Sequence, residues 1–111
     1  MSIKQNNQFD IGIVIPCYNE IDRIELSEFS TFLSSNDYIF ICFVNDGSTD
    51  GTQEILADFV NLNPKRCQVI SLTKNQGKAE AVRQGIITLL DSSKFRFVGF
   101  WDADLATPLT E

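Results

Sequence analysis

Two aspartates near the end of the chain, Asp102 and Asp104, have the spacing of a carboxylate pair that could bind a cation. In an extended or turn segment, residues two apart point the same way, so the two carboxylates would converge. Such neighbours repel each other unless a cation or a shared proton joins them. All-oxygen ligation suits Mg²⁺ or Mn²⁺, which commonly bridges protein carboxylates and substrate phosphates. The pair therefore predicts a divalent-metal site for a phosphorylated ligand.

The composition narrows the chemistry that can accompany this pair. The 111 residues contain no histidine, which excludes Ser-His-Asp triads, histidine zinc sites and histidine general bases within them. Cys17, Cys42 and Cys67 fit no zinc motif, and we interpret them as small buried apolar residues. The formal net charge of -6 argues against nucleic-acid partners. It also means that a bound diphosphate would need a local cation or a helix N-terminus.

The apolar pattern places the aspartate pair after the last of four strands. Strands are predicted at residues 11–16, 38–44, 67–72 and 95–101, where β-favouring apolar residues run almost without interruption. Three amphipathic helices are predicted between them, the first from about Ile21, the second capped by Asp50 and the third by Asn75. This alternation predicts an α/β fold with a parallel sheet, whose ligands bind beyond the carboxyl ends of the strands.

The remaining sequence predicts one domain. Residues 1–10 are mostly polar and are expected to be a disordered lead-in, so the domain is expected to span residues 11–111. The lead-in lacks the apolar core of a signal peptide, and no apolar run is long enough to span a membrane. We therefore expect a cytoplasmic location.

Polar residues follow each predicted strand and could face a ligand. After the first strand, Tyr18 offers a flat ring on which a base could stack, although the segment could also be a plain turn that caps a helix. After the second strand, Asp46 could accept a hydrogen bond from a base or a ribose, although residues 45–52 could also be a capped helix start. After the third, Lys78 either faces the ligand or is a solvated lysine, and the surrounding sequence does not fit a P-loop.

Taken together, the four segments resemble the family-2 glycosyltransferases of the GT-A fold. The matching stretches are IPCYNE at 15–20, NDGSTDGT at 45–52, NQGKAEAVRQG at 75–85 and DADLATP at 102–108. The last two look most like polyprenyl-phosphate (dolichyl-phosphate) sugar transferases, with the glucosyl type closest and the mannosyl type next. The resemblance implies a Rossmann-like, three-layer α/β/α domain with a mainly parallel sheet.

The resemblance also implies a site and a reaction. The residues expected to contact the nucleotide-sugar are Pro16, Tyr18, Glu20, Val44, Asp46, Lys78, Asp102 and Ala103. Among them, Val44 and Asp46 would meet the base. Asp104, with Asp102, would hold Mg²⁺ or Mn²⁺, which would neutralise the diphosphate leaving group of a UDP- or GDP-sugar. The sugar would pass with inversion to an acceptor such as a polyprenyl phosphate.

The family continues beyond the aspartate pair. We therefore expect residues 11–111 to be the donor-binding half of the domain, with the general base beyond Glu111 and with membrane association a property of the full-length parent. On this interpretation the 111 residues alone would bind a donor but would not transfer sugar.

Two other classes of protein stay open. A nucleotidyltransferase-like enzyme also joins such a sheet to metal carboxylates, but it usually has a glycine-rich, basic loop after the first strand, where this chain has CYNE. The other is a binding module without catalysis, such as a receiver-like domain. Such a domain would be expected to have further acidic residues after the first strand and a lysine after a fifth strand.

Overall fold

The structure is a computed structural model that describes residues 9–92 and 94–103, with strands and helices in the predicted alternation. The strands are β1 (Ile11–Cys17), β2 (Ile39–Asp46), β3 (Cys67–Leu72) and β4 (Phe97–Phe100), and the helices are α1 (Leu26–Ser35), α2 (Thr52–Leu62) and α3 (Lys78–Ser92). Within this described part, no helix combines the length and the apolar character needed to cross a bilayer.

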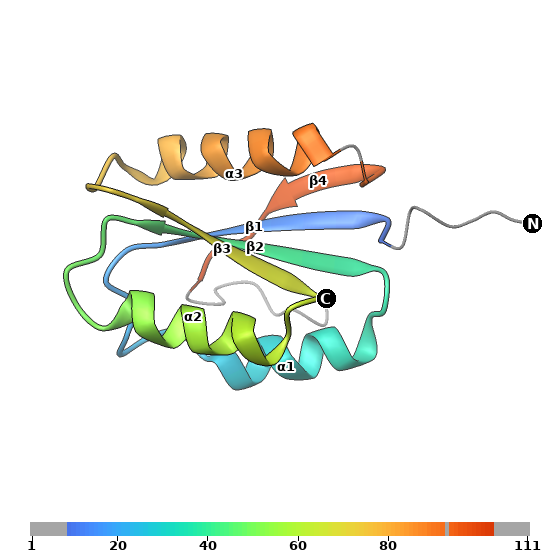
Figure 1. Cartoon of the computed structure of the whole chain (residues 1–111), viewed down its shortest axis with the longest axis horizontal. Helices are drawn as coiled ribbons and strands as arrows, with labels where there is room; N and C mark the ends of the chain where they lie inside the picture. Colours follow the sequence, from blue (N-terminus) through green and yellow to red (C-terminus); the bar gives the residue numbers. More distant parts are fainter. Residues whose placement is uncertain (1–8, 93, 104–111) are drawn as a thin grey trace, which may run out of the picture.

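The four strands form one parallel sheet in the order β3-β2-β1-β4 (Figure 1). The two central strands pair Ile15 with Phe43, and β4 joins the far side of β1 with Phe97 opposite Ile11. All strands run the same way, so the residues that follow them gather at one edge of the sheet. This edge is where the sequence placed the candidate site.

Helices cover both faces of the sheet, as Figure 1 shows, with α1 and α2 on one side and α3 on the other. Ile15 and Phe43 face α1 and α2 in a core that includes Phe29, whereas Val14 and Val44 face α3. Because β1 and β2 are covered on both faces, their sequences are nearly continuous in apolar residues. The predicted three-layer α/β/α class is therefore confirmed.

Helix α3 packs directly against β1 and β2 at Gly85, where there is no side chain between them. A Cβ atom at Gly85 would lie 2.5 Å from Cγ1 of Val14 and 2.9 Å from Cγ2 of Val44, too near for ordinary packing. The close approach fixes α3 across β1 and β2. It thereby brings Lys78, the first residue of α3, to the carboxyl edge of the sheet.

Several predicted boundaries were wrong. Helix α1 begins at Leu26 rather than near Ile21. Residues 21–23 form a separate turn, in which the amides of Arg23 and Ile24 donate to the carbonyl oxygen of Glu20. Asp50 is not the N-cap of α2, which is Gly51, although the side chain of Asp50 accepts the amide of Thr52, the first residue of the helix. Asn75 is not the N-cap of α3, which begins three residues later. Strand β4 is shorter than the predicted 95–101.

The first residues of the described chain also differ from the expected disordered lead-in. Phe9 is buried with its ring 5.6 Å from that of Phe40, and the Asp10 amide donates to the Tyr38 carbonyl at 2.9 Å. These contacts make Phe9 and Asp10 part of the fold, since they continue the packing and pairing of the sheet. The rest of the predicted lead-in lies outside the described residues.

Candidate functional site

A cleft of about 360 Å³ opens at the carboxyl edge of the sheet. Its lining residues are Pro16, Cys17, Tyr18, Glu20, Arg23, Asp46, Asn75, Lys78, Asp102 and Ala103. Small-molecule sites typically measure about 300–1,000 Å³, so the cleft is large enough for part or all of a nucleotide-sized ligand. Residues at the carboxyl end of each strand or just after it contribute to the cleft, which is the convergence that the parallel sheet predicts.

Most of the residues that the sequence singled out lie in this cleft. Those that line it are Pro16, Tyr18, Glu20, Asp46, Lys78, Asp102 and Ala103. Val44 does not: it is fully buried in the core beneath α3, because its side chain points to the face opposite that of Phe43. Asp104, the expected principal metal ligand, lies outside the described residues.

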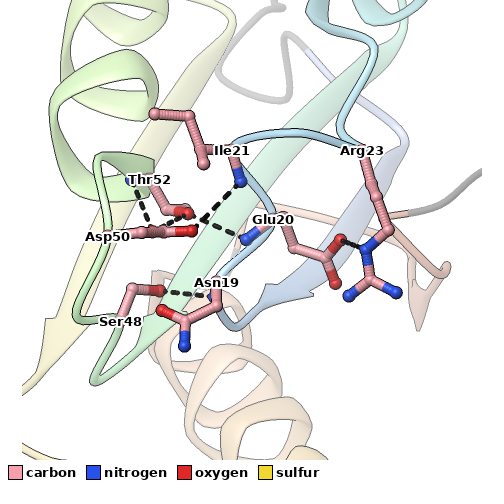
Figure 2. A network of polar contacts seen from close by, with 7 residues as sticks. All are labelled: Asn19, Glu20, Ile21, Arg23, Ser48, Asp50 and Thr52. Atoms are coloured by element: carbon pink, nitrogen blue, oxygen red, sulfur yellow. Dashed lines mark hydrogen bonds and ion pairs between the residues drawn. The ribbon is translucent and has the colours of Figure 1, made fainter.

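Tyr18 is the first residue of the β1–α1 loop, residues 18–25. Figure 2 shows how this loop is tied to the β2–α2 loop, residues 47–51. Asn19 has a φ of 51°, in the left-handed region that few non-glycine residues adopt, and this turns the chain after β1. Its amide donates to Oγ of Ser48 at 3.0 Å, and its side-chain oxygen accepts the Thr49 amide at 2.8 Å. The tyrosine ring is left 42% exposed at the cleft.

Asp50 and Thr52 hold the next part of the same loop (Figure 2). The Glu20 amide donates to Oγ1 of Thr52 at 2.9 Å, and the Thr52 hydroxyl and amide both donate to Oδ1 of Asp50. The Ile21 amide donates to the other Asp50 oxygen at 3.4 Å. The polar side chains that follow β2 therefore have a structural role, since they accept hydrogen bonds from backbone amides of the β1–α1 loop.

The charge of Asp50 belongs to this network. The hydroxyl of Thr52, followed by the backbone amides, lowers the pKa of Asp50 below its ordinary value of 3.8. Because the folded pKa lies below the unfolded one, the stabilisation is present above pH 3.8 and is lost as the pH falls through the lowered value.

Asp46 ends β2 and anchors the β3–α3 loop, residues 73–77. Its side chain is only 2% exposed and accepts the Gln76 amide at 2.8 Å, the Gly77 amide at 3.0 Å and the Asn75 side-chain amide at 3.0 Å. A carboxylate has about four lone-pair positions, so these contacts leave about one for a ligand. Asp46 thus sets the position of the residues directly before α3.

Gly47 makes this close approach possible. Its φ is +69°, and a Cβ atom there would lie 2.2 Å from the backbone nitrogen of Asn75. No other residue type combines that conformation with that contact, because any side chain would collide with backbone atoms. The glycine after Asp46 is therefore required by the neighbouring loop as well as by its own turn.

Two ion pairs flank the cleft. The Lys78 ammonium contacts Oδ1 of Asp102 and lies 5.6 Å from the centre of the Phe100 ring, and the side chains of the pair are 57% and 42% exposed. On the β1–α1 loop, Nε of Arg23 lies 3.2 Å from Oε1 of Glu20. Each basic side chain that lines the cleft is thus placed against a carboxylate that lines it too.

Cys17 lines the cleft as a neutral thiol. Burial, with a smaller contribution from the charge of Glu20, raises the pKa of this thiol far above its ordinary range. A nucleophilic cysteine must be a thiolate, so Cys17 is a packing residue rather than a reactive one.

A divalent cation fits the donor chemistry of the cleft but would need ligands from the substrate. Residues 9–92 and 94–103 contain no group of three or more side chains arranged to ligate a metal. Mg²⁺ usually needs only one or two carboxylates, with phosphates and water as its other ligands. Asp102 supplies an exposed carboxylate at the cleft, so it fits such an ion.

The sequence comparisons agree with this geometry. Residues 12–108 match the model of the family described as Glycosyl transferase family 2. The chain belongs to that family. A dolichyl-phosphate beta-glucosyltransferase of Saccharomyces cerevisiae is 31% identical over 97% of this chain and 34% of its own length. The chain spans about a fifth to a third of the length of the curated relatives it matches.

Solved structures share the fold of this family-2 chain. S. aureus TarS 1-349 in complex with UDP has a TM-score of 0.64 and 25% identity, covering 86% of this chain and 28% of that one. The mannosyltransferase PcManGT from Pyrobaculum calidifontis, in complex with GDP-Man and Mn²⁺, has a TM-score of 0.59 and 24% identity, covering 70% and 24%. The resemblance to GT-A family-2 glycosyltransferases is thereby confirmed.

Three cleft residues of the family-2 chain were not predicted as site residues. The sequence predicts Asn75 as a helix cap and Cys17 as a core residue, and it predicts no role for Arg23. An acidic and a basic residue three positions apart, Glu20 and Arg23, are a signal that could have suggested a pair in this loop. The role of Asn75 could not be found this way, since it depends on the approach of two loops distant in sequence.

Replacing Thr52 by valine should destabilise the fold. Valine has nearly the shape of threonine but cannot accept the Glu20 amide or donate to Asp50, and position 52 is fully buried. Removing the hydroxyl leaves the part-buried Glu20 amide and the Asp50 carboxylate without this partner, at a cost of about 1–3 kcal/mol. We expect urea unfolding to show a loss of that size, while Thr49→Val, which removes one exposed contact of 3.5 Å, changes stability by less than about 0.5 kcal/mol. Equal effects of the two substitutions would contradict the network.

Replacing Asp46 by asparagine should loosen the start of α3. The new amide group would turn a donor toward amides that need an acceptor, at a cost of about 1–3 kcal/mol. We expect faster hydrogen exchange at the Gln76 and Gly77 amides, and no such change in Asp37→Asn, which alters an exposed acid. Unchanged protection at these two amides would show that Asp46 does not hold the loop.

Proposed function

We propose that this chain is the donor-binding region of a metal-dependent glycosyltransferase that takes a UDP- or GDP-sugar. One observation carries the proposal: residues at or just after the carboxyl ends of all four strands, which belong to the stretches that resemble the family, line a single cleft at the carboxyl edge of the sheet. That edge is where α/β sheets bind nucleotides. The cleft also contains the chemistry that such a ligand needs, namely an aromatic face, carboxylates and a lysine.

The nucleoside would bind against the β1–α1 loop. The half-exposed ring of Tyr18 offers a stacking surface for the base, and Pro16 and Glu20 complete that wall. Asp46 would accept a base N–H through its remaining lone-pair position while its other contacts hold the β3–α3 loop. Val44 would act only indirectly, by packing behind Asp46 in the core.

The diphosphate would bind at the other wall, next to Asp102 and Lys78. Asp102, and by sequence Asp104, would hold Mg²⁺ or Mn²⁺. When bound, such an ion neutralises charge on the diphosphate leaving group. Asp102 and the backbone around Ala103 would orient the donor, and the transfer would invert the anomeric configuration in a single displacement.

The acceptor would be a polyprenyl phosphate. Support comes from the yeast and Drosophila melanogaster relatives named dolichyl-phosphate beta-glucosyltransferase, which are 31% and 30% identical to this chain. The acceptor site and any membrane contact would need segments beyond the 34% of those two relatives that this chain covers.

Calorimetry with UDP and GDP tests the donor proposal. We expect at least one of them to bind, more tightly with Mn²⁺ than without. Asp102→Asn should weaken the metal-dependent binding by at least about tenfold. Substituting a residue that only supports a metal ligand already lowers metal affinity by about 10- to 100-fold. Asp37→Asn should bind like the wild type, since Asp37 is exposed and does not line the cleft. If neither nucleotide binds with or without Mn²⁺, the proposed function is wrong.

A further inference from the structure

Negatively charged side chains outnumber positively charged ones in the cleft, although the proposed function assigns a negatively charged diphosphate to it. Three carboxylates, Glu20, Asp46 and Asp102, line the cleft against two cations, Arg23 and Lys78. Both cations contact carboxylates: Arg23 pairs with Glu20 and Lys78 with Asp102. A diphosphate that enters the cleft therefore meets net negative charge. It can bind well only if a metal cation is added, or if a basic side chain leaves its carboxylate partner and turns to the diphosphate.

Lys78 is placed to be the released cation. Gly77, the residue before Lys78, donates its amide to the Asp46 carboxylate. This contact holds the backbone of Lys78 at the cleft. Its ammonium rests on Asp102 and near the Phe100 ring, but its side chain is 57% exposed. A lysine carries its charge on a flexible four-carbon stem, so the ammonium can change partner without moving α3.

We propose that Lys78 exchanges partners when the donor binds. Lys78 pairs with Asp102 until a divalent cation occupies that carboxylate, and its ammonium then turns to the diphosphate of the donor. The inference rests on the proposed function and adds to it a residue that couples metal binding to nucleotide binding. The physical cause is competition for Asp102, because a lysine ammonium and a metal cation repel each other when they share one carboxylate.

The exchange gives Lys78 effects of opposite sign on the two ligands. Before the nucleotide binds, Lys78 competes with the metal and weakens its binding. Once the metal is bound, Lys78 strengthens nucleotide binding through a charge-assisted contact to phosphate. If Lys78 only contacted phosphate, its substitution would not change Mn²⁺ binding measured without nucleotide. If its ion pair with Asp102 were purely structural, its substitution would not change nucleotide binding. The pair of signs therefore identifies the exchange.

The test measures the two ligands separately. Mn²⁺ binding without nucleotide is followed by the EPR signal of free Mn²⁺, and UDP and GDP binding at saturating Mn²⁺ is followed by calorimetry. Lys78→Met should bind Mn²⁺ about two- to fivefold more tightly, the range expected when an exposed ion pair is removed. It should bind the nucleotide at least about fivefold more weakly, since a charge-assisted contact is lost.

Two controls separate the exchange from a general change of charge or folding. Lys78→Arg keeps a cation at the site and should restore most of the nucleotide affinity. Lys74→Met removes the same charge from an exposed position that does not line the cleft, and both affinities should stay within about 1.5-fold of wild type. Lys78→Gln, which keeps a polar side chain, should reproduce the Lys78→Met result if that variant folds poorly.

The outcomes distinguish the two proposals. Wild-type protein that binds neither UDP nor GDP overturns the proposed function. Wild-type protein that binds the nucleotide, together with a Lys78→Met variant whose Mn²⁺ affinity is unchanged or reduced, overturns the exchange alone. An equal effect of Lys74→Met would also overturn it, because the effect would then come from net charge rather than from the contact with Asp102.

Discussion

The candidate site depends on the hydrogen bonds that the buried carboxylate of Asp46 accepts. A charge that is 2% exposed is costly unless it is fully hydrogen-bonded, and the chain satisfies it with two backbone amides and one side-chain amide of the β3–α3 loop. This requirement draws the loop over Gly47 and fixes where α3 begins. The position of Lys78, and with it the ion pair to Asp102, follows from that one contact.

The β2–α2 loop supports the opposite wall of the cleft in a similar way. Its polar side chains accept the amides of Asn19, Glu20 and Ile21, so Tyr18 is presented from a loop that is itself held in place. Small polar residues and glycines are needed here because two loops approach closely and their amides need partners. The family's second motif is thus explained by loop support at least as much as by ligand contact.

The fold was largely predictable, because uninterrupted apolar strands alternating with amphipathic helices leave little choice but a parallel sheet. The parallel sheet in turn predicted that the residues after the strands would meet. The sequence could not show which side chains the protein uses for itself. Asn75 is of a residue type that often caps helices, but its side chain donates to Asp46 instead. Val44, which the family resemblance implies would meet the base, is buried in the core next to Gly85. These outcomes depend on contacts between distant segments, which local spacing does not encode.

The most direct test of the account is to map a nucleotide onto the chain by NMR. Titration of ¹⁵N-labelled protein with UDP or GDP and Mg²⁺ should shift the amide signals of Tyr18, Glu20, Lys78 and Ala103, which come from segments distant in sequence but line one cleft. The amides of Asp37 and Cys67, at the opposite edge of the sheet, should stay unchanged. Shifts confined to that opposite edge, or none at saturating nucleotide, would contradict the claim that the carboxyl edge is a nucleotide-sugar site.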